Sequence, residues 1–108
     1  MKSDRLYTLG TLQATNQPPT AGVDYRGAAQ GEVYVPATPQ LTTLTWYTSP
    51  DGLTFYPAYD GTGVLVTSVV SSNKATAIPT PTTLQGAGLL AVQVDVAGPV
   101  TLVFANKS

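Results

Sequence analysis

The chain has 108 residues and a mass of 11.2 kDa, which is the size of one ordinary domain. Hydrophobic residues make up 43% of the chain, so we expect it to fold, whereas charged residues make up only 10%, against about 25% in typical soluble domains. The five cations are scattered and the net charge is −1, so neither a nucleic acid nor an anionic membrane surface is an expected partner.

The first thirty residues differ from the rest in composition. The polar segment Met1–Arg5 leads into no continuous apolar block, so we do not interpret it as a secretory signal. Leu6–Leu9 has the alternation of a short strand, and Gln13–Gly22 is polar, aperiodic and punctuated by proline and glycine, which is typical of a loop or arm. We therefore predict an N-terminal arm or linker over residues 1–30 and a folded domain over residues 31–108.

Within the predicted arm, Tyr25 lies between Asp24 and Arg26. One interpretation is a local turn with an exposed ion pair, which contributes little to stability. The other is an anchor on a partner protein, because tyrosine and arginine are frequent among the residues that dominate binding energy. Asp24, Tyr25 and Arg26 are therefore candidate partner-binding residues.

From Gly31 onward, short β-branched runs alternate with turn signals. Glu32–Val35 is predicted to be a strand that ends at Pro36. The next predicted strand is Leu41–Thr48, and Ser49-Pro50-Asp51-Gly52 has the residues of a type I turn that pairs it with Leu53–Tyr59 as a hairpin. Because Pro57 cannot donate a ladder hydrogen bond, that second strand is expected at a sheet edge or at a bulge.

The second half of the chain continues the pattern. Further strands are predicted at Val64–Val70, Ala75–Ile78, Ala87–Val96 and Val100–Phe104, with a proline-rich connection at Pro79–Gly86 that is long enough to cross between two sheets. The periodicity of two places three alternating groups toward the core: Leu44 with Trp46, Leu90 with Val92, Val94 and Val96, and Val100 with Leu102 and Phe104.

These elements predict an all-β fold with about seven strands after residue 30, arranged as an antiparallel sandwich of the jelly-roll or immunoglobulin-like kind. Trp46, Phe55 and Phe104 are expected to supply the bulkiest core groups. Tyr47 and Tyr56 are expected on the surface, where tyrosine combines an apolar ring with a polar tip and suits a hydrated interface.

The sequence contains few residues of the types that usually act in catalysis. With neither histidine nor cysteine in the chain, the commonest general base, nucleophile and zinc ligands are missing, and no disulfide can form. Asp51 and Asp60 each precede a glycine, so we interpret both as turn residues rather than as a catalytic pair. Asp60-Gly61-Thr62-Gly63 has only a faint likeness to a calcium loop, because the repeated acidic positions are missing. We therefore expect no enzyme, no cofactor and no metal site.

The stretch from Leu44 to Asp60 contains the pattern S-x-D-G-x-x-F-x-P-x-Y-D between two strands. It resembles small β-sandwich proteins in the structural modules of tailed phages, of the head-fibre, head-decoration or minor virion type. The resemblance covers roughly residues 30 to 105 and implies a structural role without catalytic residues. A shorter form of the pattern, S-x-D-G-x-x-F, also occurs in carbohydrate-binding sandwiches.

We therefore expect a virion structural protein, made in the host cytoplasm, that binds the outer surface of the capsid as a decoration or head-fibre protein. Its expected partner is the major capsid protein or another virion protein, in a homo-oligomer or symmetric lattice. The alternative is a carbohydrate-binding or adhesion module for a surface glycan, with Tyr47, Tyr56 and Asp60 as its best binding set. The candidate partner-binding residues are Asp24, Tyr25, Arg26, Tyr47 and Tyr56.

Overall fold

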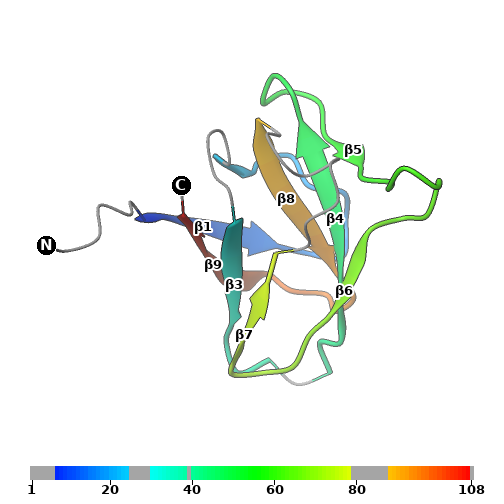
Figure 1. Cartoon of the computed structure of the whole chain (residues 1–108). Coiled ribbons are helices and arrows are strands. Elements are labelled where there is room, and N and C mark those ends of the chain that lie inside the picture. Colours follow the sequence, from blue (N-terminus) through cyan, green and yellow to red (C-terminus); the bar gives the residue numbers. More distant parts are fainter. Residues whose placement is uncertain (1–6, 25–29, 39, 79–87, 108) are drawn as a thin grey trace, which may run out of the picture.

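The computed structural model describes residues 7–24, 30–38, 40–78 and 88–107, and this part of the chain is built from strands without helix (Figure 1). The strands are β1 (Tyr7–Ala14), β2 (Val23–Asp24), β3 (Gln30–Val35), β4 (Thr43–Ser49), β5 (Tyr56–Pro57), β6 (Thr67–Val69), β7 (Lys74–Ala77), β8 (Leu89–Val94) and β9 (Val100–Lys107). The predicted all-β class is confirmed.

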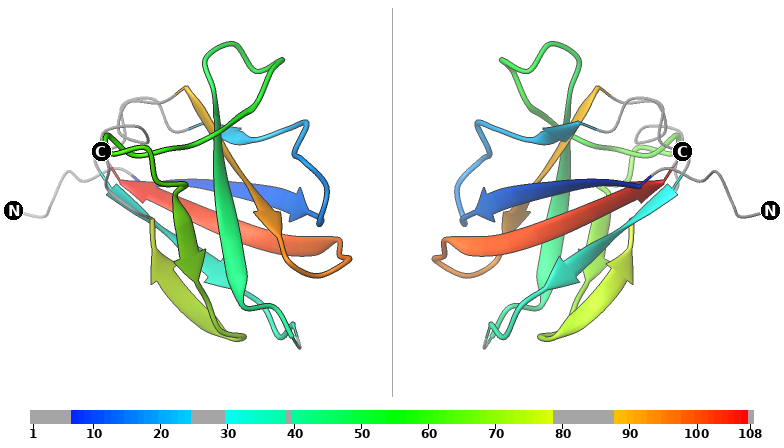
Figure 2. Two further views of the ribbon diagram at one scale, coloured as in Figure 1. Left: turned by 90° about the vertical axis from the view of Figure 1, so that its right-hand side faces the viewer. Right: turned by 90° about the vertical axis from the view of Figure 1, so that its left-hand side faces the viewer.

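The strands form two antiparallel sheets. One sheet has the order β1-β9-β3-β7, and the other has the order β2-β8-β4-β5, with β6 also paired to β4. The chain passes from one sheet to the other at nearly every connection, and its last strand lies between β1 and β3 (Figure 2). Of the two architectures expected from the sequence, this order is that of the jelly roll. The predicted crossing at Pro79–Gly86 lies outside the described residues, but β7 and β8 on either side of it belong to different sheets.

Strands β5 and β6 are two parts of one edge strand. Both run antiparallel to β4, with Tyr47 opposite Pro57 and Thr45 opposite Thr67. Between them, Ala58 N–H donates to the Trp46 carbonyl (2.9 Å) and Trp46 N–H donates to the Val66 carbonyl (3.1 Å). The intervening residues 59–65 therefore form a protruding excursion from the edge. The predicted edge position of Pro57 is confirmed.

The core lies between the sheets and follows the predicted alternation. Trp46 and Phe104 are fully buried and meet edge to face, with ring centroids 6.1 Å apart and planes at 82°. The Trp46 indole N–H donates to the Ser68 hydroxyl at 2.8 Å, so burial of the indole leaves no unpaired donor. Phe55, the third predicted core aromatic, is only half-buried and packs against the cluster. The largest fully buried side chains are Trp46, Phe104, Leu44, Leu90, Leu102, Val33, Val92 and Ser49.

The predicted arm over residues 1–30 is wrong for the part that the structure describes. β1 pairs with β9 along its whole length, from Tyr7 opposite Lys107 to Ala14 opposite Val100. Leu12, Ala14 and Val23 are buried in the core. The sandwich thus begins at or before Tyr7, and residue 30 is not a domain boundary. Residues 15–22 form a loop as predicted. A chain lacking residues 1–30 would lose two strands and cannot be expected to keep the sandwich intact.

Candidate interaction surface

The structure separates the five candidate partner-binding residues. Tyr25 and Arg26 lie outside the described residues. Asp24 ends β2, where its backbone pairs with Leu89 of β8. Tyr56 is 55% exposed on the edge strand, as predicted.

The expectation of an exposed Tyr47 is wrong. Tyr47 is only 8% exposed, and its hydroxyl donates to the Gln93 side-chain carbonyl at 2.9 Å. Its neighbour Trp46 points into the core, so Tyr47 lies on the outer face of its sheet. The loop between β4 and β5 folds back over this face, because the Phe55 ring reaches the backbone of Gly22 and Leu89 approaches Gly52. This loop explains how a side chain on an outer face is buried.

Asp51 organises the turn between β4 and β5. Its Oδ1 accepts hydrogen bonds from the amides of Leu53 (2.9 Å) and Thr54 (3.1 Å), and Gly52 N–H donates to the Ser49 hydroxyl (2.8 Å). Gly52 has a φ of 78°, a conformation that glycine adopts without strain. The predicted turn role of Asp51 is confirmed.

Asp60 organises the excursion between β5 and β6 in the same way. Its Oδ1 accepts hydrogen bonds from the amides of Thr62 (2.8 Å) and Val64 (3.0 Å) and from the Thr62 hydroxyl (2.6 Å).

A third carboxylate, Asp95, lies just after β8. It accepts hydrogen bonds from the Thr42 hydroxyl (2.5 Å) and the Thr42 amide (3.1 Å), which fixes the entry to β4. All three carboxylates thus serve local structure.

These hydrogen bonds lower the pKa of each carboxyl below its ordinary value of 3.8. The main causes are the Leu53 and Thr54 amides for Asp51, the Thr62 hydroxyl and Val64 amide for Asp60, and the Thr42 hydroxyl for Asp95. A lowered folded-state pKa stabilises the fold above pH 3.8, and this contribution is lost as the pH falls through the folded-state pKa.

The consequence can be measured by acid titration. We expect NMR titrations of these three carboxyl groups to have midpoints below 3.8, and the melting temperature to fall between about pH 4 and pH 2. Asp60→Asn keeps an acceptor oxygen but cannot titrate, so its melting temperature should fall less over that range than that of the unaltered protein. An Asp60 midpoint at or above 3.8 would contradict the hydrogen-bond pattern.

Exposed apolar side chains gather in one segment of the chain, which comprises the β4–β5 loop and the edge strand that follows it. Of seven large hydrophobic side chains that are exposed among the described residues, six lie between residues 53 and 69, and the seventh is Tyr34 on β3. Leu53 and Val69 are both 84% exposed. Asp60 is the single charged residue in this segment of the sequence. We call this set the apolar belt; its members are Leu53, Tyr56, Tyr59, Val64, Leu65 and Val69.

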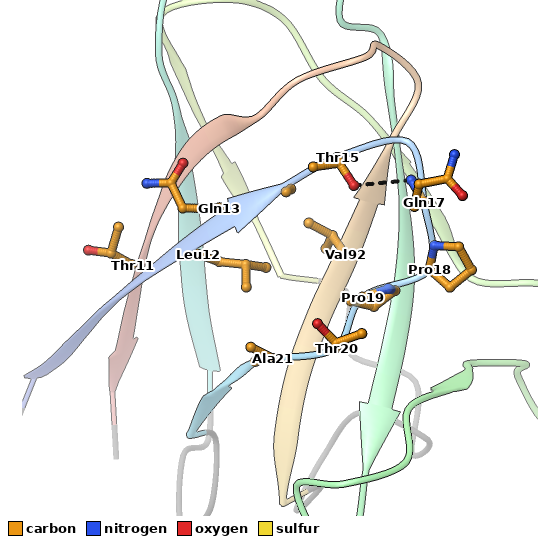
Figure 3. A pocket seen from close by; sticks show the side chains of 12 residues that line it. Thr11, Leu12, Gln13, Thr15, Gln17, Pro18, Pro19, Thr20, Ala21 and Val92 are labelled. Carbon is orange, nitrogen blue, oxygen red and sulfur yellow. Dashed lines mark hydrogen bonds between the residues drawn. The ribbon is translucent and has the colours of Figure 1, made fainter.

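A groove lies on another side of the sandwich, away from the apolar belt. It has a volume of about 370 Å³ and lies between β1 and the segment that returns to β2 (Figure 3). Leu12 and Val92 contribute apolar surface, Pro18 and Pro19 line one wall, and every lining residue is uncharged. The groove contains no general acid, base or charged ligand, and none of the candidate residues lies in it.

Other sites are not found in the described part of the chain. It holds no cluster of three histidine, cysteine or acidic side chains that could bind a metal ion. Nor does it hold a helix that is long and apolar enough to span a membrane.

Comparison of the chain with protein-family models, with curated proteins and with solved structures yields no match. The site is therefore interpreted from its own geometry. The sequence did not predict the apolar belt, because Leu53, Tyr59 and Val64 alternate with polar residues as core positions do.

Proposed function

We propose that this protein is a structural component of a tailed-phage virion that binds the outer surface of the capsid. Its partner is the major capsid protein or another virion protein. The apolar belt is the observation that carries the proposal, and the resemblance of the segment from Leu44 to Asp60 to phage head proteins supplies the kind of partner.

The belt supports an assembly role because it exposes six large apolar side chains within seventeen residues that contain a single charge. Such patches mark contact sites for other molecules. Burying exposed apolar area stabilises a complex by about 25 cal/mol for each Å² removed from water. Side chains as exposed as Leu53 and Val69 have most of that area still to bury.

The alternative glycan-binding function has lost part of its support. It depended on Tyr47 and Tyr56 as a pair of stacking platforms beside Asp60. Tyr47 is buried under the β4–β5 loop, and the Oδ1 atom of Asp60 is occupied by its own excursion. Tyr56 alone remains as an exposed platform.

Binding to heads that lack the protein tests the proposal. We expect the purified protein to bind such heads at a copy number that matches capsid symmetry. Occupancy should change little between 0.15 M and 1 M sodium chloride, although the screening length falls from about 8 Å to about 3 Å, because apolar contacts do not depend on ion pairs.

Quantitative gel analysis of sedimented heads gives the occupancy. Release of the protein by salt alone at neutral pH would show that ion pairs hold it in place. Absence of binding to heads, together with saturable binding to a glycan array that Tyr56→Ala abolishes, would support the adhesion module instead.

A further inference from the structure

The excursion between β5 and β6 is an addition to the sandwich rather than part of its core. Ala58 and Val66 at its base are buried, and Val66 N–H donates to the Ala58 carbonyl at 2.9 Å. This hydrogen bond closes the excursion at its root. Figure 1 shows the chain between β5 and β6 projecting away from both sheets. Residues 59–65 therefore form a protruding hairpin, which we call the knob.

The knob is ordered by its own hydrogen bonds. Tyr59 and Leu65 form a β-bridge, Asp60 N–H donates to the Val64 carbonyl (2.9 Å), and Gly63 N–H donates to the Asp60 carbonyl (3.0 Å). The Asp60 carboxylate adds the three hydrogen bonds described above. A contact element that is ordered before binding loses less conformational entropy when it binds.

The knob presents apolar surface despite this order. Tyr59 is 52% exposed and Val64 59% exposed, with Leu65 exposed beside them. Tyr56 and Val69 flank the root, but they lie on opposite faces of the sheet, because Tyr56 is opposite Thr48 and Val69 is opposite Thr43.

The charge of residues 53–69 favours a protein over a membrane as the binding partner of the knob. Residues 53–69 contain no lysine or arginine, and their one charge is the anion Asp60. Loops that bind anionic lipid surfaces use clustered cations, so the knob lacks the chemistry for a headgroup layer. An uncharged apolar hollow on a protein complements it.

The geometry also argues against pairing by strand addition at this edge. Such pairing needs a continuous run of free backbone groups. Here β5 has two residues, β6 has three, and the knob stands between them. Side chains of the knob must therefore make the contact.

We propose that the knob inserts into an uncharged, apolar hollow on the capsid protein and is the principal anchor of this chain. This inference rests on the proposed function, since it names the part of the apolar belt that makes the attachment.

Excision of the knob is the direct test. Ala58 N–H and the Val66 carbonyl together make the two hydrogen bonds to Trp46 that one residue of a continuous edge strand would make. Deleting residues 58–65 should therefore join Pro57 directly to Val66 and leave Val66 opposite Trp46, with β5 and β6 still running in one direction along β4. We expect this variant to keep the melting temperature and β-type circular dichroism of the parent within a few degrees, and to lose detectable binding to heads.

Point variants provide a matched pair. Val64→Ser in the knob should weaken binding to heads by about tenfold or more, as for a residue at the centre of an interface. Val69→Ser removes an equally apolar, more exposed side chain outside the knob and should weaken binding by less than about threefold. If the excised chain fails to fold, this pair decides the question.

The outcomes separate the two proposals. Suppose that the parent protein binds heads. If the folded excision variant or Val64→Ser then binds as well as the parent, the knob is not the anchor, and the proposed function stands. If the parent does not bind heads at all, the proposed function fails. Two results would overturn the inference. If the parent binds neutral lipid vesicles and the excision variant does not, the knob contacts a membrane. If the parent self-associates and the excision variant does not, the knob contacts a second copy of the chain.

Discussion

Trp46→Ala is expected to lower the free energy of unfolding by about 3–5 kcal/mol, a large fraction of the 5–15 kcal/mol typical of a domain. Three losses combine at this position. The indole is fully buried, it makes an edge-to-face contact with Phe104, and it donates to Ser68. Truncation leaves a cavity between the sheets that neighbouring β-branched side chains cannot fill, and it leaves the Ser68 hydroxyl without its donor.

Urea unfolding followed by circular dichroism measures this effect. Val69→Ala is a suitable control, because Val69 is 84% exposed and should change stability by less than about 0.5 kcal/mol. A loss below about 1 kcal/mol for Trp46→Ala would show that Trp46 is not a central core residue.

Gly22→Ala is expected to destabilise the fold by about 1–3 kcal/mol, the usual cost of an overpacked site. A Cβ atom at Gly22 would lie 2.6 Å from the Leu90 carbonyl oxygen and 2.9 Å from the Phe55 ring. The carbonyl belongs to the backbone of a central strand and cannot move away cheaply. Displacing Phe55 would lift the loop that covers Tyr47.

Gly61→Ala is the matched control for this substitution. A Cβ atom at Gly61 has no neighbour within 4 Å, and neither glycine has a positive φ. The two variants therefore differ in steric space alone, and Gly61→Ala should leave the melting temperature within about 2 °C of the parent. Equal melting temperatures for the two variants would contradict the close packing of the β4–β5 loop on β2.

Much of the sandwich could be predicted because its central strands carry their pattern locally. Trp46, Val92 and Leu102 each occupy one phase of a period-two alternation, and each is buried. The aspartates before Gly52 and Gly61 predicted two turns, because a short carboxylate can accept hydrogen bonds from the amides that follow it.

The N-terminal strand was predicted only at its start, within Leu6–Leu9, because its partner is the most distant segment of the chain. β1 is a strand by virtue of pairing with β9, about ninety positions later in the sequence. Its own residues alternate weakly, since Gly10 and Ala14 carry little apolar surface and Thr11 is polar. Local composition therefore favoured an arm, and the long-range pairing decided otherwise.

The candidate site was predicted less well for a related reason. Tyr47 and Tyr56 look equivalent in the sequence, but one is covered by a loop that folds back from the next turn and the other is not. Burial on the outer face of a sheet depends on what packs over it, and alternation within the strand carries no information about that cover.

The position of β9 between β1 and β3 sets an order of events during biosynthesis. Strands β1 and β3 both pair with β9, so neither can form that pairing until residues 100–107 have left the ribosome. At about 5–20 residues per second, the earlier strands wait several seconds without that partner. Completion of this sheet thus follows the synthesis of residues 100–107, and a chain that lacks them cannot complete the domain.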